Sequence, residues 1–235
     1  FDGENIKKII VRKANKGEKI TTLDDKERIL DEEDLLICSD KESLAIAGVL
    51  GGKNSQINNA TTSIIIESAN FDAISVRKTA QRLGIRSDAV MRFEKSLDPN
   101  WCEMAIKKAA ELVKKVCPQA KFNYELIEAG DFKNQEQIIN LDILWAEKII
   151  GQKIEDKKIE NILSSLGLEI KDKNDNIWQI AIPSWRQKDL KIKQDLIEEI
   201  VRIYGYNNIS NSLPESSILP PEKDPETELI KQSKN

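Results

Sequence analysis

Four carboxylates in the C-terminal half of the sequence are spaced as metal ligands could be. Asp195, Glu198 and Glu199 follow the spacing i, i+3 and i+4, and Asp189 lies six residues earlier. On a helix, this spacing puts the carboxylates on one face. Carboxylates held close together repel one another unless a cation compensates, and a hard ion such as Mg²⁺ accepts their oxygens. The alternative is an ordinary solvated helix face paired with neighbouring lysines and arginines, and residue types alone favour it.

A fifth carboxylate, Glu67, directly follows an apolar run and lies downstream of three glycines. The run is the β-branched segment 64–66, which is typical of a strand covered on both faces, and the glycines are Gly48, Gly51 and Gly52. Glycines let a ligand approach backbone N–H groups, and a carboxylate can accept a hydrogen bond from a substrate hydroxyl. The alternative is a glutamate at a strand end, bonded to a nearby arginine. The glycine pair matches neither a P-loop nor a dinucleotide-binding fingerprint.

A third group of residues is basic and falls within one short stretch. Its members are Arg77, Lys78, Arg82, Arg86, Arg92 and Lys95. Such a group could line a path for a phosphate backbone, but solvated helix surface is the more common explanation. No base-reading motif accompanies it, so we expect no DNA binding.

The composition excludes several classes of catalyst. The 235 residues include no histidine, so a Ser-His-Asp or Cys-His mechanism and a histidine-ligated zinc are excluded within them. The three cysteines are odd in number and widely spaced, so we expect buried thiols in a reducing compartment rather than disulfides. The net charge of −4 argues against wholesale electrostatic capture of nucleic acid.

The sequence shows neither a membrane span nor a secretory leader. No apolar run approaches the roughly 20 residues that cross a bilayer. We therefore expect a cytoplasmic protein without membrane contact. The chain starts at Phe1 rather than at methionine, which indicates a piece of a longer protein.

Strands and then helices must position these groups. Short apolar runs broken by turn signals predict short strands in the first part, including an apolar strand over 44–52. A helix over 73–83 is predicted between Asp72 as N-cap and Gly84 as C-cap. A longer helix with one apolar stripe follows, and Asp98 is its predicted cap.

The second part of the chain predicts a smaller unit. A strand leads into a short helix that ends at Gly151, and a second helix is stopped by Gly167. A hairpin turns at Asn174-Asp175, and a final helix carries three of the four spaced carboxylates.

The predicted fold class is α+β. A mixed α/β module is expected over residues 1–130, and a small winged-helix-like α+β domain over residues 131–206. The Asn, Ser and Pro content of residues 207–235 predicts a linker toward a further domain.

Three stretches, read whole, resemble one family. They are "LAIAGVLGGKNS", "TTSIIIESANFDAISVRKTAQRLGIRSDAVMRFEKSLDP" and "IAIPSWRQKDLKIKQDLIEEIVRIYGYNNI". In this order they closely resemble the beta subunit of bacterial phenylalanine-tRNA ligase, and the similarity extends over nearly all of residues 1–210.

The resemblance implies a division of labour. The first module corresponds to part of the editing module, beta-subunit domains three and four, which hydrolyses tyrosine wrongly attached to tRNA(Phe). The second corresponds to domain five. Synthesis takes place on the alpha subunit, in an α2β2 assembly that uses ATP and magnesium. A piece such as this one is therefore not expected to bind ATP or to aminoacylate alone.

The same resemblance implies roles for five residues of the editing pocket. Glu67 matches the acceptor for the tyrosine hydroxyl, and Ser87 and Ala89 match positions that line the pocket. Gly48 and Gly51 match the glycines whose backbone faces the aminoacyl ester. The editing histidine of the family falls upstream of this sequence, so weak or no editing is expected from this piece by itself.

The resemblance also implies a metal. Asp189, Asp195, Glu198 and Glu199 match four acidic positions assigned to a Mg²⁺ ion shared with the alpha subunit. This sequence has one more residue between Arg186 and Asp189 than many relatives have. A competing hypothesis is a scaffold that docks the alpha subunit and positions tRNA without any editing activity.

Overall fold

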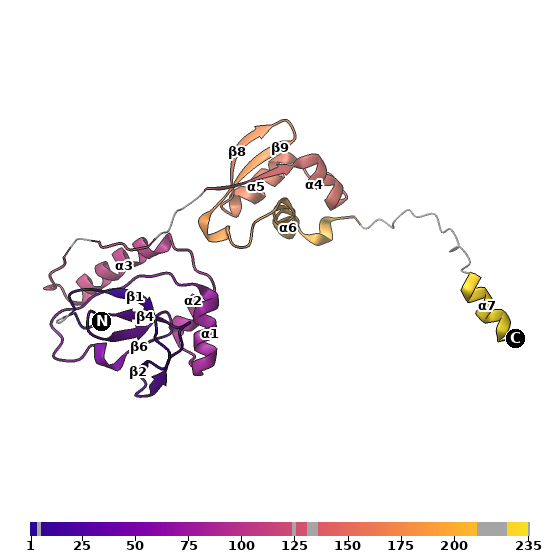
Figure 1. The fold of residues 1–235 in the computed structure, drawn as a ribbon. Helices are drawn as coiled ribbons and strands as arrows, with labels where there is room; N and C mark the ends of the chain where they lie inside the picture. The colour runs from indigo at the N-terminus through magenta and orange to yellow at the C-terminus, as the bar shows by residue number, and fades with distance from the viewer. Residues whose placement is uncertain (4–5, 124–125, 131–135, 211–224, 235) are drawn as a thin grey trace.

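A computed structural model shows two folded units in succession (Figure 1). The structure describes residues 1–3, 6–123, 126–130, 136–210 and 225–234. No helix among these residues is both long and apolar enough to cross a lipid bilayer. The α+β fold class is confirmed, because helices and antiparallel sheets occur in both units.

The first unit is built on a four-stranded antiparallel sheet with the order β1-β4-β5-β6. Its strands are β1 (Ile10–Lys13), β4 (Leu35–Cys38), β5 (Ser43–Ile46) and β6 (Leu50–Gly51), and a separate hairpin is formed by β2 (Lys19–Thr21) and β3 (Glu27–Ile29). Both faces of β4 are buried. Leu36 packs in the cluster that contains helix α1, whereas the next residue, Ile37, packs against Phe1 and Phe71 on the other face.

Three helices follow the sheet of the first unit. They are α1 (Ala73–Leu83), α2 (Asp88–Phe93) and α3 (Trp101–Val116), and the 3-10 turn η1 (Lys53–Ser55) precedes them. The predicted caps of α1 are confirmed, because Asp72 accepts a hydrogen bond from Ser75 N and Gly84 adopts φ +64°. The apolar side of α1 packs on the sheet through Val76 and Ala80.

Three predictions about the first unit were wrong. The apolar segment 44–52 is a tight hairpin of β5 and β6 rather than one strand. The β-branched run 64–66 forms only an isolated bridge from Ile64 to Asp2, and Ile64 is 42% exposed. Asn100 is the N-cap of α3, and the carboxylate of Asp98 instead accepts a hydrogen bond from Asn100 N.

The predicted burial of the cysteines is confirmed only for Cys38. Cys102 is half-buried and Cys117 is exposed, and all three thiols are free. The exposure follows from the position of the last two on α3 and at its end. None of the residues of α3, all of which are described, is buried.

The second unit is a three-stranded antiparallel sheet with the order β7-β9-β8, packed against three helices. Its elements are β7 (Gln137–Asp142), α4 (Ile143–Ile150), α5 (Asp156–Ser165), β8 (Glu169–Asn174), β9 (Ile177–Ile182), η2 (Ser184–Arg186), α6 (Lys193–Tyr204) and η3 (Tyr206–Asn208). The predicted strand, helices and hairpin are all present. Gly151 ends α4 with φ +86°, and Asp175 turns the hairpin with φ +50°.

One continuous core holds the second unit together. Leu141 of β7, Ile180 of β9 and Leu163 of α5 are fully buried in it, together with Leu196 and Ile200 of α6. Because α6 places its apolar side in this core, the orientation of its charged residues is fixed. Most of the predicted linker over 207–235 lies outside the described residues, and its described end contains helix α7 (Pro225–Ser233).

Candidate functional site

The turn between β5 and β6 contains Gly48, and Ser87 is hydrogen-bonded to the turn residue Val49. Gly48 in this turn has φ +69°, a conformation that L side chains rarely adopt. A Cβ atom at this position would lie 2.8 Å from Phe71 Cδ2 and 2.9 Å from Val76 Cγ2. The turn therefore requires glycine, and it abuts both α1 and the segment that carries Phe71.

The backbone at this turn offers one unused donor. Val49 N donates to Ile46 O at 3.0 Å, whereas Gly48 N has no hydrogen-bond partner among the described residues. Gly48 is also partly exposed. A free backbone N–H beside bare backbone is the type of group that can stabilise a developing oxyanion.

Gly51 is placed differently from Gly48. It lies in β6 opposite Ala45, and its carbonyl accepts a hydrogen bond from Leu23 N at 3.0 Å. A Cβ atom here would lie 3.0 Å from Leu23 Cδ1. In this structure the absence of a side chain at Gly51 admits Leu23.

Ser87 and Ala89 lie at the start of α2, against the same turn. Ser87 is the N-cap of α2, and its Oγ accepts from Val90 N at 3.1 Å and donates to Val49 O at 2.6 Å. The hydroxyl is thus engaged on both sides and ties α2 to the turn. Ala89 follows in the first helical turn and is partly exposed.

Glu67 lies in the extended segment that leads to Phe71. Its side chain keeps exposed surface, yet desolvation by the surrounding protein raises the pKa of its carboxyl above the usual value. It makes no hydrogen bond or ion pair with any other described residue, so it is not the arginine-bonded strand end that was the alternative. Glu67 is therefore an acceptor that the described part of the chain leaves open.

The four carboxylates predicted to bind magnesium are held in three different ways. Asp195 Oδ2 accepts from the backbone N atoms of Lys191 and Ile192 at 2.7 and 2.9 Å, and these bonds lower its pKa. Glu198 is exposed. Asp189 and Glu199 are both engaged by arginine side chains.

Glu199 is buried and lies between two guanidinium groups. Arg202 Nη2 is 2.6 Å from its Oε2, and Arg186 Nη2 is 3.1 Å from its Oε1. Burial opposes the ionisation of Glu199, but the hydrogen bonds from Arg202 and Arg186 outweigh it and lower the pKa. Asp189 raises the pKa of Arg186, and Glu199 adds to this effect.

As arranged, these residues do not fit a magnesium ion. No group of three or more Asp, Glu, Cys or His side chains within the described ranges could hold a metal. Mg²⁺ requires several oxygens at about 2.0–2.1 Å in octahedral geometry. Here Asp195 caps a helix, and the oxygens of Asp189 and Glu199 face arginines, so the magnesium site stays a prediction.

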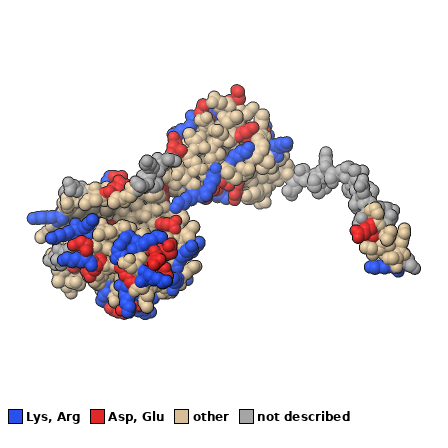
Figure 2. Space-filling view, viewed as in Figure 1, with Lys and Arg blue, Asp and Glu red and all other residues tan. Residues whose placement is uncertain are grey.

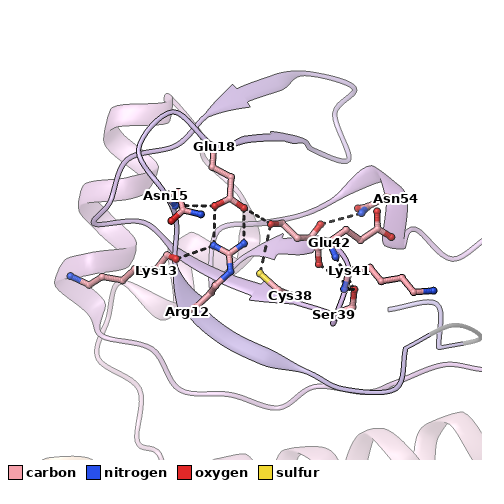
Figure 3. Close-up of polar contacts among 10 residues, drawn as sticks. Arg12, Lys13, Asn15, Glu18, Cys38, Ser39, Lys41, Glu42 and Asn54 are labelled. Carbon is pink, nitrogen blue, oxygen red and sulfur yellow. Dashed lines mark hydrogen bonds and ion pairs between the residues drawn. The ribbon is translucent and has the colours of Figure 1, made fainter.

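Sequence reasoning missed a polar network at the opposite end of β5 from Gly48. Arg12 donates from two nitrogens to the two carboxylate oxygens of Glu18 at 2.9 and 2.8 Å (Figure 3). Ser43 Oγ donates to Glu18 Oε1 at 2.8 Å. Together with a bond from Asn15 N, these contacts lower the pKa of Glu18 to about 2, the bond from Arg12 being the largest cause. The network borders a cavity of about 540 Å³ that Cys38 also lines. Its members come from separate segments without a motif, so no sequence signal marks it.

Some members of the basic group over residues 77–95 form ion pairs with nearby carboxylates. Arg82 pairs with the buried Asp34, which also accepts from Thr79 Oγ1 at 2.8 Å, and Arg92 lies 3.7 Å from Asp88. Basic and acidic side chains are interspersed over the visible face of the unit (Figure 2). This mixture supports the solvated-surface explanation for much of the group.

The two units also contact each other at one buried carboxylate. Ser184 Oγ of η2 donates to Asp98 Oδ2 at 2.6 Å, and Asn100 N donates to Asp98 Oδ1 at 2.9 Å. This contact explains why Asp98 does not cap α3. Its signal is not local, since 86 residues separate the partners.

Comparisons with known families match both units. The B3/4 domain matches residues 1–118, and the tRNA synthetase B5 domain matches residues 139–206. Proteins named phenylalanine--tRNA ligase beta subunit from Solibacter usitatus, Staphylococcus haemolyticus and Protochlamydia amoebophila are similar to this chain, at 36%, 38% and 39% identity over 91%, 91% and 95% of it. The chain spans 27–29% of the length of these relatives.

A solved structure is also similar in part. It is an N-terminal fragment of the phenylalanyl-tRNA synthetase beta-subunit from Pyrococcus horikoshii, at 14% identity and a TM-score of 0.47. The matched region covers 88% of this chain and 59% of the solved chain. No conclusion rests on a likeness of this size.

Proposed function

The chain belongs to the B3/4 domain family, in the form that occurs in phenylalanine-tRNA ligase beta subunits, and from this premise we propose that its first unit contributes an editing pocket for tyrosine attached to tRNA(Phe). The holoenzyme, with an alpha subunit in an α2β2 assembly, would charge tRNA(Phe) with the use of ATP in the cytoplasm. This chain would not itself bind ATP.

The need for such a pocket follows from the two amino acids. Phenylalanine and tyrosine differ by one hydroxyl, which an apolar synthetic pocket rejects only weakly. A pocket built to hydrogen-bond that hydroxyl discriminates by about 10⁴ or more. A second, polar pocket is therefore the effective place to recognise tyrosine.

Glu67 carries the proposal. It is a partly desolvated carboxylate without a partner among the described residues, and an ionised carboxylate only accepts hydrogen bonds. A phenol O–H could satisfy it, whereas a phenylalanine ring would leave it unsatisfied. Such an unpaired acceptor costs binding free energy, so the hydroxyl would determine which amino acid stays bound.

The neighbouring groups suit the remaining tasks. Gly48 offers its unused backbone N–H to the oxygen of the aminoacyl ester, on which negative charge develops during hydrolysis. Ala89 leaves room for the ring, and Ser87 holds the wall of the pocket through Val49. The proposed nucleophile is a positioned water assisted by the ribose hydroxyls of the substrate.

The test is clearance of tyrosyl-tRNA(Phe) by the complete enzyme that contains this chain. Glu67→Ala is expected to slow hydrolysis by about 100-fold, since it removes a hydrogen bond to a charged acceptor together with the selectivity that depends on it. Glu32→Ala, at an exposed glutamate of the same unit, is the matched control and should hydrolyse at the wild-type rate. Unchanged clearance by both variants would instead favour the scaffold that only positions tRNA.

A further inference from the structure

The acidic group of the second unit consists of Asp189, Asp195, Glu198 and Glu199. Arg186 contacts two of its members, Asp189 and Glu199. Its Nε and Nη2 are each 2.8 Å from Asp189 Oδ2, and its Nη2 and Nη1 reach the two oxygens of Glu199 at 3.1 and 3.4 Å. Only one-fifth of the Arg186 side chain is exposed. One guanidinium thus bridges two carboxylates that are ten residues apart in the sequence.

Two arginines balance the charges of Asp189 and Glu199 without any ion. Asp189 and Glu199 carry two negative charges when ionised, and Arg186 and Arg202 carry two positive charges. An arginine is always protonated, and its planar fork suits bidentate contact with carboxylates. A divalent ion between Asp189 and Glu199 would add charge to these four balanced side chains and would have to displace Arg186.

The third carboxylate is committed to the helix. Asp195 is N3 of α6 and accepts from the backbone N–H of the N-cap residue Ile192, which has no intrahelical partner, and from that of Lys191 just before it. Turning Asp195 toward a metal would uncap α6. Groups of this chain therefore already bind the carboxylates of Asp189, Asp195 and Glu199.

We propose that Arg186 is the resident cation of this acidic group, and that the second unit forms the group without a divalent metal. The guanidinium takes the place predicted for Mg²⁺. It neutralises the repulsion between Asp189 and Glu199 and connects η2 to α6. Because η2 also contains Ser184, Arg186 fixes the turn that presents the Ser184 hydroxyl to Asp98 of the first unit. Arg186 is thus a positioning residue for the contact between the units.

This inference rests on contacts within the second unit and on the contact of Ser184 with Asp98, and it stands independently of the editing proposal. The first arm of the test uses the full chain. Its melting temperature is expected to be the same in EDTA and in 10 mM MgCl₂, and Arg186→Gln is expected to lower it. Arg186→Lys, which keeps the charge but loses the fork, should recover part of the loss, and Lys121→Gln, at a distant residue, should have no effect.

The second arm uses the complete enzyme, because the predicted ion is one shared with the alpha subunit. Bound Mn²⁺ is counted by electron paramagnetic resonance for the wild type and for Glu199→Gln, with assembly checked by gel filtration. Equal stoichiometry in the two enzymes supports the proposal. Loss of one Mn²⁺ on substitution of Glu199, or a wild-type chain whose melting temperature rises with MgCl₂ and falls with EDTA, would overturn it.

Discussion

In the first unit Glu67 stands in a partly desolvated place without a partner among the described residues, whereas in the second unit the more deeply buried Glu199 is held by Arg186 and Arg202. The surroundings raise the pKa of Glu67 and lower that of Glu199. An acceptor left open in this way is available to a ligand, while one closed by two arginines serves the fold. The comparison separates a carboxylate without a side-chain partner among the described residues from one held by two arginines.

The two units differ in their cores in the same sense. The second unit has one continuous cluster that joins β7, β9, α5 and α6. In the first unit the sheet has separate clusters on its two faces, and α3 has no buried residue. The first unit therefore places its candidate pocket among turns and helix starts, and tight contacts at those turns must hold it.

The largest effect is expected at Gly48. Replacement by alanine should destabilise the first unit by about 3 kcal/mol, because a positive φ is combined with overlap with Phe71 and Val76. Gly84→Ala is the matched control: its φ is +64° but no atom lies within 4 Å, so about 1 kcal/mol is expected. Urea unfolding of the first unit, monitored by hydrogen exchange, measures the free energy of unfolding of both variants. Equal losses of stability would show that packing does not fix the turn.

Glu18→Gln tests whether the first unit also contains a closed carboxylate. Since the folded pKa of Glu18 is about 2 against an ordinary value of 4.5, its ionised form stabilises the fold. The loss at pH 7 should be about 2 kcal/mol after allowance for solvent screening.

The effect of Glu18 depends on pH with a defined sign. A lowered folded pKa gives stability that is fully present above about pH 4.5 and is lost as the pH falls through about 2. The difference between the wild type and Glu18→Gln should therefore shrink below pH 4.5, as measured by urea unfolding across pH. A difference that stays constant down to pH 2 would contradict the assigned network.

Two adjacent residues of α6 give a sharp contrast within the second unit. Glu199→Gln should cost about 1.5 kcal/mol, because it leaves Arg186 and Arg202 short of a charged acceptor. Glu198→Gln, at an exposed position, should change the stability by less than about 0.5 kcal/mol. Similar losses in urea unfolding would remove the distinction between closed and solvated carboxylates.

A smaller effect than at Glu199 is expected at the contact between the units. Ser184→Ala should cost about 1 kcal/mol or less, because Asp98 keeps its bonds from Asn100. The distribution of distances between fluorophores placed on α1 and α5 should broaden in this variant. An unchanged distribution would show that the hydrogen bond does not orient the units.

Local chemistry in the sequence predicted most of the secondary structure. Asp72 and Gly84 bound α1 as expected, and Asp175 turns the β8–β9 hairpin, because caps and turns depend on neighbours within a few residues. The segment 64–66 failed as a strand although its residues favour one. Strand formation needs a partner edge, and here only Asp2 provides a bridge.

The candidate sites depended on contacts that the sequence does not show. Asp98 was expected to cap a helix but is bound by a serine from the other unit. Arg202 could be named as a partner of the acidic face from its spacing, whereas Arg186 reaches Glu199 only because η2 folds back on α6. Likewise, nothing local reveals that Glu67 is left without an arginine.

The most direct test of the account is the ratio of hydrolysis rates for tyrosyl-tRNA(Phe) and phenylalanyl-tRNA(Phe), measured with the complete enzyme carrying Glu67 or Glu67→Leu. If the open carboxylate recognises the phenol, leucine should lower this ratio by about 100-fold or more. The melting temperature of Glu67→Leu should equal or exceed that of the wild type, since no described contact is lost. A ratio that does not change on substitution of Glu67 would contradict the account.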